Sequence, residues 1–249
     1  MKQRVVKSAV RTIQVLEFFD EMRSDASVMD VARALNYPQS STSGLLKSLV
    51  ALGYLSYDPY ARLYTPTHRV ALLGSWVEAP SLRQVVQLME ELGRQTGETI
   101  MLGEQTGVIV RYIYVVPSRQ LLRLHVGPGL IRPVATSGMG RLFLSTYPTE
   151  KVRELLKRIN AEQKPGEPIF RLSDMQADFE EIRARGYAVS MNRITPGATV
   201  VATMVPHTEG FPPLAMSIGG FTESVMKRVE EFAGLMKSAI RLHLSPSNS

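Results

Sequence analysis

The stretch SVMDVARALNYPQSSTSGLLKSLVALGYL, residues 27–55, constrains the fold more than any other part of the chain. Apolar residues recur at helical spacing in its first half, and Ser27 stands where a helix N-cap is expected. Asn36-Tyr37-Pro38 ends that helix, because the residue before a proline is driven out of the α region. A second helix begins at Pro38 or just after it. The pattern predicts two short helices joined by a tight turn.

The second helix, predicted over residues 39–50, has one apolar and one polar face. Leu45, Leu46 and Leu49 form the apolar stripe. Short polar side chains on the other face reach base edges and phosphates when such a helix enters the major groove, but they also cap free amides in helices that bind nothing. The first reading predicts a helix-turn-helix, in which Ser27 is a further DNA contact. The polar face comprises Gln39, Ser40, Ser41, Thr42, Ser43 and Lys47.

A small β-hairpin is predicted directly after these helices. Residues 53–57 and 62–66 read as two short strands around the proline-containing turn at residues 58–61. Three helices followed by a hairpin form the winged version of the helix-turn-helix. Arg62, beside the hairpin turn, either reaches the DNA minor groove or backbone or is an ordinary polar turn residue.

Residues 5–22 are predicted to form the first helix of this domain. Its basic start either rests on DNA phosphates, with a strongly salt-dependent contribution, or is a solvated terminus. The residues expected on its buried face are Ala9, Val10, Ile13, Leu16 and Phe19. The basic residues are Lys2, Arg4, Lys7 and Arg11.

The charge distribution favours double-stranded DNA as a partner of the N-terminal part. The chain has a net charge of +6 and an isoelectric point near 9.6. Residues 1–75 carry nine Lys or Arg against six Asp or Glu, and residues 76–249 carry twenty against seventeen. The two parts thus have equal net charge, but the shorter part carries more than twice as much net positive charge per residue. This supports a polyanionic partner, although many basic proteins bind no nucleic acid.

Composition excludes several kinds of site. The absence of cysteine excludes disulfides, thiol catalysis and thiolate metal ligands. The four histidines have no i, i+4 spacing, so neither a metal nor a cofactor is expected. No apolar run is long enough to span a bilayer, and the start of the chain does not read as a signal peptide, which predicts a cytoplasmic protein without membrane contact. The histidines are His68, His125, His207 and His243.

A short apolar helix is predicted over residues 70–77. It holds Trp76, the single tryptophan, and is more apolar than a linker in a monomer needs. This helix buries its apolar side either against the first domain or against a second subunit, and DNA half-sites about one helical turn apart call for a dimer. With a boundary at residues 78–81, the predicted organisation is a DNA-binding domain over 1–68, a dimerising linker helix over 69–80 and a second domain over 81–249.

From residue 82 onward the chain mixes strands and helices. An amphipathic helix, capped by Ser81 and closed by Gly93 or Gly97, comes first. Strands joined as hairpins with helices at their periphery predict an α+β domain around a largely antiparallel sheet. The predicted strands are 99–104, 108–115, 121–126, 187–193, 199–206 and 214–218. The later predicted helices are 138–146, 149–158, 174–185 and 222–242.

Two stretches of this second domain are candidate ligand sites. Residues 133–141, PVATSGMGR, end an extended run and open a helix, whose free N–H groups and positive dipole end suit a carboxylate or phosphate. Gly138 and Gly140 permit close approach there, but an ordinary capped helix with glycines for packing has the same sequence. Along residues 215–220, Ser217 either faces a cavity or lies in a packed core strand.

These stretches resemble the IclR family of bacterial transcription regulators over almost the whole chain. The resemblance implies an N-terminal winged helix-turn-helix, a linker helix that dimerises, and a C-terminal GAF-like domain that binds a small effector. Family members are often dimers or dimers of dimers, and they repress or activate operons for the catabolism of small organic or aromatic acids. The segments that carry the resemblance are VKSAVRTIQVLEFF, LNYPQSSTSGLLKSLVALGYLSYDP, RPVATSGMGRLFLS, RARGYAVSMNRITPGATVVATMV and PPLAMSIGGF.

The resemblance also places the effector contacts. Family contacts through backbone amides fall on Gly138 and Met139, where the helix opens. A frequently acidic position falls on Ser190, and a polar or thiol position ten residues later falls on Val200. Two serines frequent on the last strand correspond to Ser217 and Gly219.

The loss of the acid, the thiol and one hydroxyl implies a roomier and less polar pocket than a small keto acid needs. We therefore expect a larger organic acid, such as an aromatic acid, with its carboxylate on the amides of the helix opening. Tyr187, Met191 and Met204 are expected either to contact its apolar part or to belong to the core.

The predicted function is that of a DNA-binding regulator, expected to repress a catabolic operon; an activator of the same family is the alternative. An enzyme is the competing class, with Ser137 as nucleophile and His125 or His207 as base. Because Ser137 lacks a G-x-S-x-G elbow and no motif brings a histidine to it, no catalytic residue is predicted. A third class is a module that uses its winged helix to bind protein.

Overall fold

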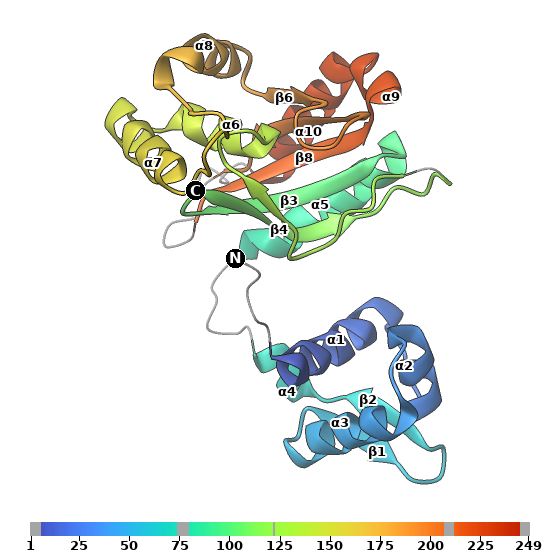
Figure 1. Cartoon of the computed structure of the whole chain (residues 1–249). Coiled ribbons are helices and arrows are strands. Elements are labelled where there is room, and N and C mark those ends of the chain that lie inside the picture. The colour runs from blue at the N-terminus through green and yellow to red at the C-terminus, as the bar shows by residue number, and fades with distance from the viewer. Residues whose placement is uncertain (1–5, 74–79, 122, 207–211, 245–249) are drawn as a thin grey trace. The chain divides into compact units, whose positions relative to one another are not determined.

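The computed structural model describes residues 6–73, 80–121, 123–206 and 212–244 (Figure 1). The chain consists of two compact units, divided between Glu78 and Ala79. The first unit contains a three-helix cluster with a hairpin, and the second contains a six-stranded sheet with helices on both faces. The predicted α+β class is confirmed. No helix in the described part of the chain is long and apolar enough to cross a membrane.

The N-terminal unit is a winged helix-turn-helix. Its two strands pair antiparallel, with Leu55 opposite Pro66 and Asp58 opposite Leu63. In chain order the elements are α1 (Lys7–Met22), α2 (Val28–Leu35), α3 (Gln39–Ala51), β1 (Leu55–Asp58), β2 (Leu63–Pro66) and α4 (His68–Leu72). Of the predicted apolar linker helix, only the residues before 74 belong to the described part of the chain, and Trp76 lies outside it.

Both ends of α2 and the start of α3 form where the sequence predicts them. The Ser27 hydroxyl accepts the Asp30 N–H at 3.3 Å, and the Asp30 carboxylate accepts the Ser27 N–H at 2.9 Å, which makes a capping box. Asn36 ends α2 in the left-handed conformation with φ 54°. Pro38 is the N-cap of α3, so that the proline costs the helix no hydrogen bond.

The buried face of α1 agrees with the predicted one only in part: Phe19 is buried as predicted and Leu16 packs against the core. Val15, Phe18 and Phe19 are buried, while Ala9 is exposed and Ile13 is 55% exposed. Apolar residues occur on more than one side of this helix, and the side with two aromatic rings fills the space against the other elements because it buries the most apolar area. The core it joins includes Val31, Leu46, Leu49, Leu55 and Tyr64.

The C-terminal unit is built on one antiparallel sheet in the order β5-β4-β3-β8-β7-β6. At the centre of the sheet, the first strand of this unit, β3, pairs with its last strand, β8. The strands are β3 (Thr99–Thr106), β4 (Ile109–Val116), β5 (Ile131–Pro133), β6 (Ala188–Met191), β7 (Ala198–Met204) and β8 (Leu214–Phe221).

The predicted strand at residues 121–126 is wrong. The strand that pairs with β4 on the side away from β3 is β5, and Leu121 is fully exposed. Gly129 has a positive φ and donates to the carbonyl of Tyr112, so the chain joins β4 only as it enters β5. The apolar residues before this point face a cavity and solvent instead of completing a strand pair.

Helices cover both faces of the sheet (Figure 1). One core lies between the sheet and α6 (Gly138–Thr146), α7 (Thr149–Ala161) and α8 (Gln176–Arg185). The other lies between the sheet and α5 (Pro80–Thr96) and α10 (Val229–Leu244). Met101 faces the first core and its neighbours Ile100 and Leu102 face the second, as the two-residue period of a strand requires.

The predicted helix at residues 222–242 is two helices. α9 (Thr222–Met226) ends before α10 begins, and the Arg228 guanidinium between them donates to the carbonyl of Thr96. Val225 and Phe232 are both fully buried in the same core. The sequence pattern alone does not reveal this break, because residues seven positions apart lie on the same side of an uninterrupted helix as well.

Candidate functional site

α3 presents part of the predicted polar face. Gln39, Ser40 and Lys47 are exposed, and Ser41 and Ser43 are half-buried. The placement of Thr42 on this face is wrong, because its side chain is fully buried and its hydroxyl donates to the carbonyl of Pro38 at 3.1 Å. Thr42 lies four and seven residues before the buried Leu46 and Leu49 and so shares their side of the helix.

The hairpin tip is a turn stabilised by hydrogen bonds to one side chain, and it carries two exposed side chains. The Asp58 carboxylate accepts the N–H of Tyr60 at 2.7 Å and of Ala61 at 3.1 Å. Tyr60 is 98% exposed, and Arg62 is exposed with φ 59°. The sequence predicts Arg62 at this tip but misses Tyr60, for which the only signal is its position inside the turn after Asp58-Pro59.

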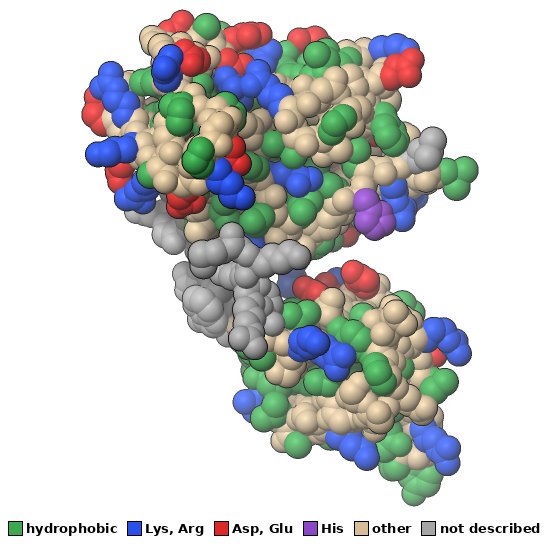
Figure 2. All heavy atoms as spheres, viewed as in Figure 1, with side chains coloured by type: hydrophobic (Ala, Val, Ile, Leu, Met, Phe, Trp, Pro, Cys, Tyr) green, Lys and Arg blue, Asp and Glu red, His purple; other side chains and the backbone are tan. Residues whose placement is uncertain are grey.

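Basic side chains stand at several separate places on the face of the N-terminal unit seen in Figure 2. Lys7 is exposed at the first turn of α1, whereas Lys2 and Arg4 lie outside the described residues. Arg11 lies 4.8 Å from the ring centroid of Tyr37, which gives it a packing role. The Ser27 hydroxyl is engaged in the capping box of α2.

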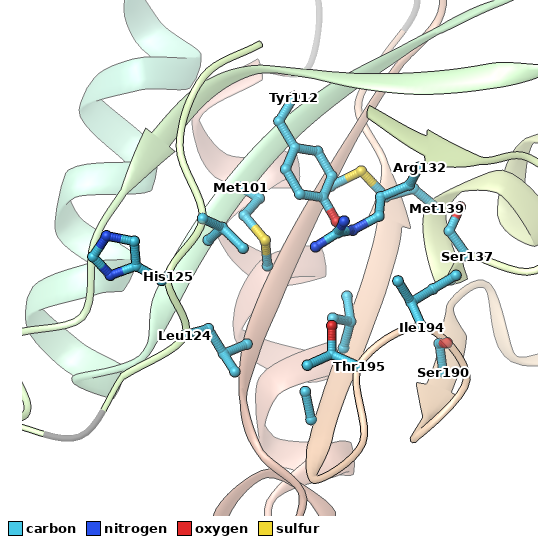
Figure 3. A pocket seen from close by; sticks show the side chains of 14 residues that line it. Met101, Tyr112, Leu124, His125, Arg132, Ser137, Met139, Ser190, Ile194 and Thr195 are labelled. Carbon is cyan, nitrogen blue, oxygen red and sulfur yellow. The ribbon is translucent and has the colours of Figure 1, made fainter. Parts of the chain in front are cut away.

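The second candidate site is a cavity of about 90 Å³ between the sheet and the start of α6 (Figure 3). Its walls come from β3, β4, β5, β6 and β7, from the segments that follow β4 and β6, and from the first residues of α6. Its lining is Met101, Tyr112, Leu124, His125, Val126, Arg132, Ser137, Gly138, Met139, Ser190, Ile194, Thr195, Ala198 and Val200.

The start of α6 leaves two amides free. Ser137 caps the helix, since its hydroxyl accepts the Gly140 N–H at 3.2 Å and its carbonyl accepts the Arg141 N–H at 2.9 Å. The N–H groups of Gly138 and Met139 have no partner among the described residues, as expected of a first helical turn. Both residues line the cavity, which therefore faces the positive end of the helix dipole.

Arg132 and Tyr112 supply a second polar group that sequence reasoning missed. The guanidinium carbon of Arg132 lies 6.0 Å from the centroid of the Tyr112 ring, and both side chains point into the cavity (Figure 3). Burial raises the pKa of the Tyr112 hydroxyl, and the neighbouring guanidinium partly opposes that rise. Arg132 forms no ion pair with a described residue, and no Asp or Glu lines the cavity.

The structure brings together four of the six predicted effector residues. Gly138, Met139, Ser190 and Val200 line the cavity. The other two, Ser217 and Gly219, do not line it. The Ser217 side chain is fully buried in β8, and its hydroxyl has no hydrogen-bond partner among the described residues.

Gly219 is covered by a methionine of the neighbouring strand. A Cβ at this position would lie 2.7 Å from Cε of Met101, which itself lines the cavity. The expected apolar contacts are also elsewhere. Tyr187 belongs to the core on the opposite face, Met191 is 49% exposed, and Met204 packs on the core beside α6 without lining the cavity.

The described residues contain no arrangement that supports catalysis at Ser137. Its hydroxyl caps α6, and no hydrogen bond joins it to His125, which lies on the other side of the cavity in Figure 3. His207 lies outside the described residues. No group of His, Asp or Glu within the described part of the chain is placed to hold a metal ion.

The family models that match are the IclR helix-turn-helix domain, over residues 8–59, and the bacterial transcriptional regulator IclR C-terminal domain, over residues 78–242. Among curated proteins, the acetate operon repressor of Salmonella typhimurium is 24% identical over 95% of this chain and 88% of its own. The regulator XynR of Escherichia coli is 22% identical over 89% of this chain and 88% of its own.

Solved structures show the same fold. The Thermotoga maritima IclR structure has a TM-score of 0.59 at 22% identity, covering 94% of this chain and 96% of that one. An IclR transcriptional regulator from Alicyclobacillus acidocaldarius has a TM-score of 0.59 at 22% identity, covering 95% and 97%. The two family models together span both units of the structure. The chain therefore belongs to the IclR family of bacterial transcriptional regulators and is a DNA-binding protein that regulates transcription.

Proposed function

We propose that this regulator represses a catabolic operon and that a small organic acid, bound in the cavity beside α6, weakens its complex with operator DNA. The observation that carries the proposal is the lining of that cavity. It contains one guanidinium and two free helix amides and no carboxylate. A buried anion would find its charge compensated there, whereas a buried cation would not.

The volume of the cavity bears on the size of the acid. At about 90 Å³ it is smaller than the engineered cavity of about 150 Å³ that holds benzene in another protein. This volume supports a compact acid and not the larger acid that the family resemblance led us to expect. An aromatic acid needs the wall around Leu124 to move outward.

For DNA binding we propose that α3 enters the major groove and that the hairpin tip touches the adjacent backbone or minor groove. Gln39, Ser40 and Lys47 are the exposed side chains that the groove would meet, and Arg62 with Tyr60 extends from the hairpin. Ser41 and Ser43, half-buried on the same helix, and Ser27, Lys7, Lys2 and Arg4 remain proposed contacts. One recognition helix reads one half-site, so we propose a homodimer, with pairing of dimers as a further step.

Repression is supported by relatives whose names state it. The Salmonella typhimurium relative is named an acetate operon repressor, and AllR of Klebsiella pneumoniae, 23% identical, is named a transcriptional repressor. The sign of regulation depends on where the operator lies relative to the promoter, and only a transcription assay measures that position.

A gel-shift assay with the DNA upstream of the protein's own gene tests the proposal. We expect a shift that unrelated competitor DNA does not remove, that K47A together with R62A abolishes, and that a compact organic acid weakens. Arg153→Ala together with Arg158→Ala, on the exposed face of α7, is the charge-matched control and should bind like the parent. Transcription from the same promoter should rise when the acid is added. Sequence-specific binding that no acid changes would refute the effector part alone.

A further inference from the structure

The cavity beside α6 carries two separate sets of anion-binding donors. We infer that its effector is a short dicarboxylate, with one carboxylate bound by Arg132 and Tyr112 and the other by the Gly138 and Met139 amides with Ser190. This inference rests on the proposed function, because it names the class of acid for the same site. It also assigns Arg132 as the residue that determines specificity for the second carboxylate.

The first donor set is the guanidinium of Arg132 with the hydroxyl of Tyr112. Tyr112 is 5% exposed, so its hydroxyl lies inside the cavity wall, and the guanidinium stands beside it (Figure 3). Arg132 forms no ion pair with a described residue. A guanidinium presents paired N–H donors that match the two oxygens of one carboxylate, and the tyrosine hydroxyl adds a third donor.

The second donor set lies at the first turn of α6. The N–H groups of Gly138 and Met139 are without a protein partner in the described chain and line the cavity. Ser190 lines it too, is 6% exposed, and has a hydroxyl with no hydrogen-bond partner among the described residues. A Cβ on Gly138 would lie 3.0 Å from the Ser190 Cβ, so the Ser190 side chain lies directly beside the helix start.

The two sets lie apart and no acidic residue neutralises either one. In Figure 3 the Ser190 hydroxyl and the Arg132 guanidinium are well separated across the cavity. A monocarboxylate would satisfy one set and leave the donors of the other without an anionic partner. A dicarboxylate satisfies both.

The apolar walls and the volume limit the length of this acid. Met101, Leu124, Ile194 and Val200 line the space between the polar groups and suit a short methylene chain. Because the cavity of about 90 Å³ is smaller than one that takes benzene, a chain of about four or five carbons is the best match. Succinate and glutarate are therefore the probes.

The test is isothermal titration calorimetry on the full chain with matched ligands. Succinate and glutarate are compared with butyrate and with succinamate, which has the length of succinate but only one charge. We expect the better dicarboxylate to bind at least about tenfold more tightly than either single-charge ligand, since one charge-assisted pair is lost in each of them.

Variants assign the donors. In R132Q, succinate and succinamate should bind with about equal affinity. R132K, which keeps the charge without the paired donors, should show an intermediate preference for succinate. Y112F and S190A should each weaken dicarboxylate binding by a few fold, in line with the loss of one hydrogen bond. Arg119→Gln removes an exposed arginine of the segment after β4 and should leave the advantage intact. The circular dichroism spectrum and the urea unfolding midpoint of the full chain show that each variant is folded.

Different results separate this inference from the proposed function. If butyrate or succinamate binds as tightly as succinate, or if R132Q keeps the tenfold preference, the two-carboxylate assignment is overturned. Release of DNA by a monocarboxylate such as benzoate or pyruvate, without any preference for a dicarboxylate, overturns the inference and leaves the proposed function standing. If no acid binds and no acid alters the DNA complex, the inference and the effector part of the proposed function are both refuted.

Discussion

Alanine substitution at two helical glycines should change stability in opposite directions. In α6, a Cβ on Gly140 would lie 2.1 Å from the carbonyl oxygen and 2.5 Å from the Cα of Val134. Both are backbone atoms, so no side chain can rotate to make room. The helix start has to move away by about 1 Å to reach an ordinary van der Waals separation.

The magnitude follows from the balance of two terms. Overpacking of this kind typically costs about 1–3 kcal/mol, and more where backbone must move. The gain in helix propensity from Gly to Ala offsets about 0.8–1 kcal/mol of that cost. We expect Gly140→Ala to lower the free energy of unfolding by about 2 kcal/mol and to weaken acid binding, because the shift displaces the amides of Gly138 and Met139.

Gly234→Ala in α10 is the matched control. A Cβ there meets nothing within 4 Å, so only the propensity term remains and the variant should be more stable by about 0.5–1 kcal/mol. Urea unfolding of the full chain, followed by circular dichroism, measures both changes, and amide hydrogen exchange in α6 and α10 assigns them to this unit. The reasoning fails if Gly140→Ala is as stable as the parent protein.

Three further predictions concern the capping box, the DNA contacts and the cavity. Ser27→Ala should lower the stability of the N-terminal unit by about 1 kcal/mol in thermal unfolding. The hydrogen bonds from Ser27 lower the pKa of Asp30 in the folded state. They therefore stabilise the folded state at pH values above the usual pKa of a carboxyl group, and this stabilisation should be lost as the pH falls through the lowered pKa. Lys47→Ala and Arg62→Ala should each reduce the slope of log affinity for DNA against log salt concentration by about 1, and an unchanged slope would exclude a phosphate contact. Ser190→Leu fills the space beside the free amides of α6 and should abolish acid binding in calorimetry without loss of specific DNA binding; undiminished affinity would show that the acid does not lie there.

The sequence by itself determined the features that depend on neighbouring residues. The N-cap at Ser27, the helix end at Asn36 and the helix start at Pro38 all rest on interactions within a few positions, so local rules predict them. Most strands and helices of the C-terminal unit follow from the same periodicity. The order of several such segments also sufficed for the family resemblance, and through it for four of the cavity residues.

Tertiary structure alone decided which of several apolar faces is buried and which side chains share the cavity. The aromatic side of α1, and not the side with Ile13, faces the core, since packing partners distant in sequence select it. Arg132 meets Tyr112 only because β5 pairs with β4, and Gly219 is closed off only because Met101 lies over it from the adjacent strand. The direction of a strand side chain depends on register and partner strands, and those contacts join residues far apart in the chain.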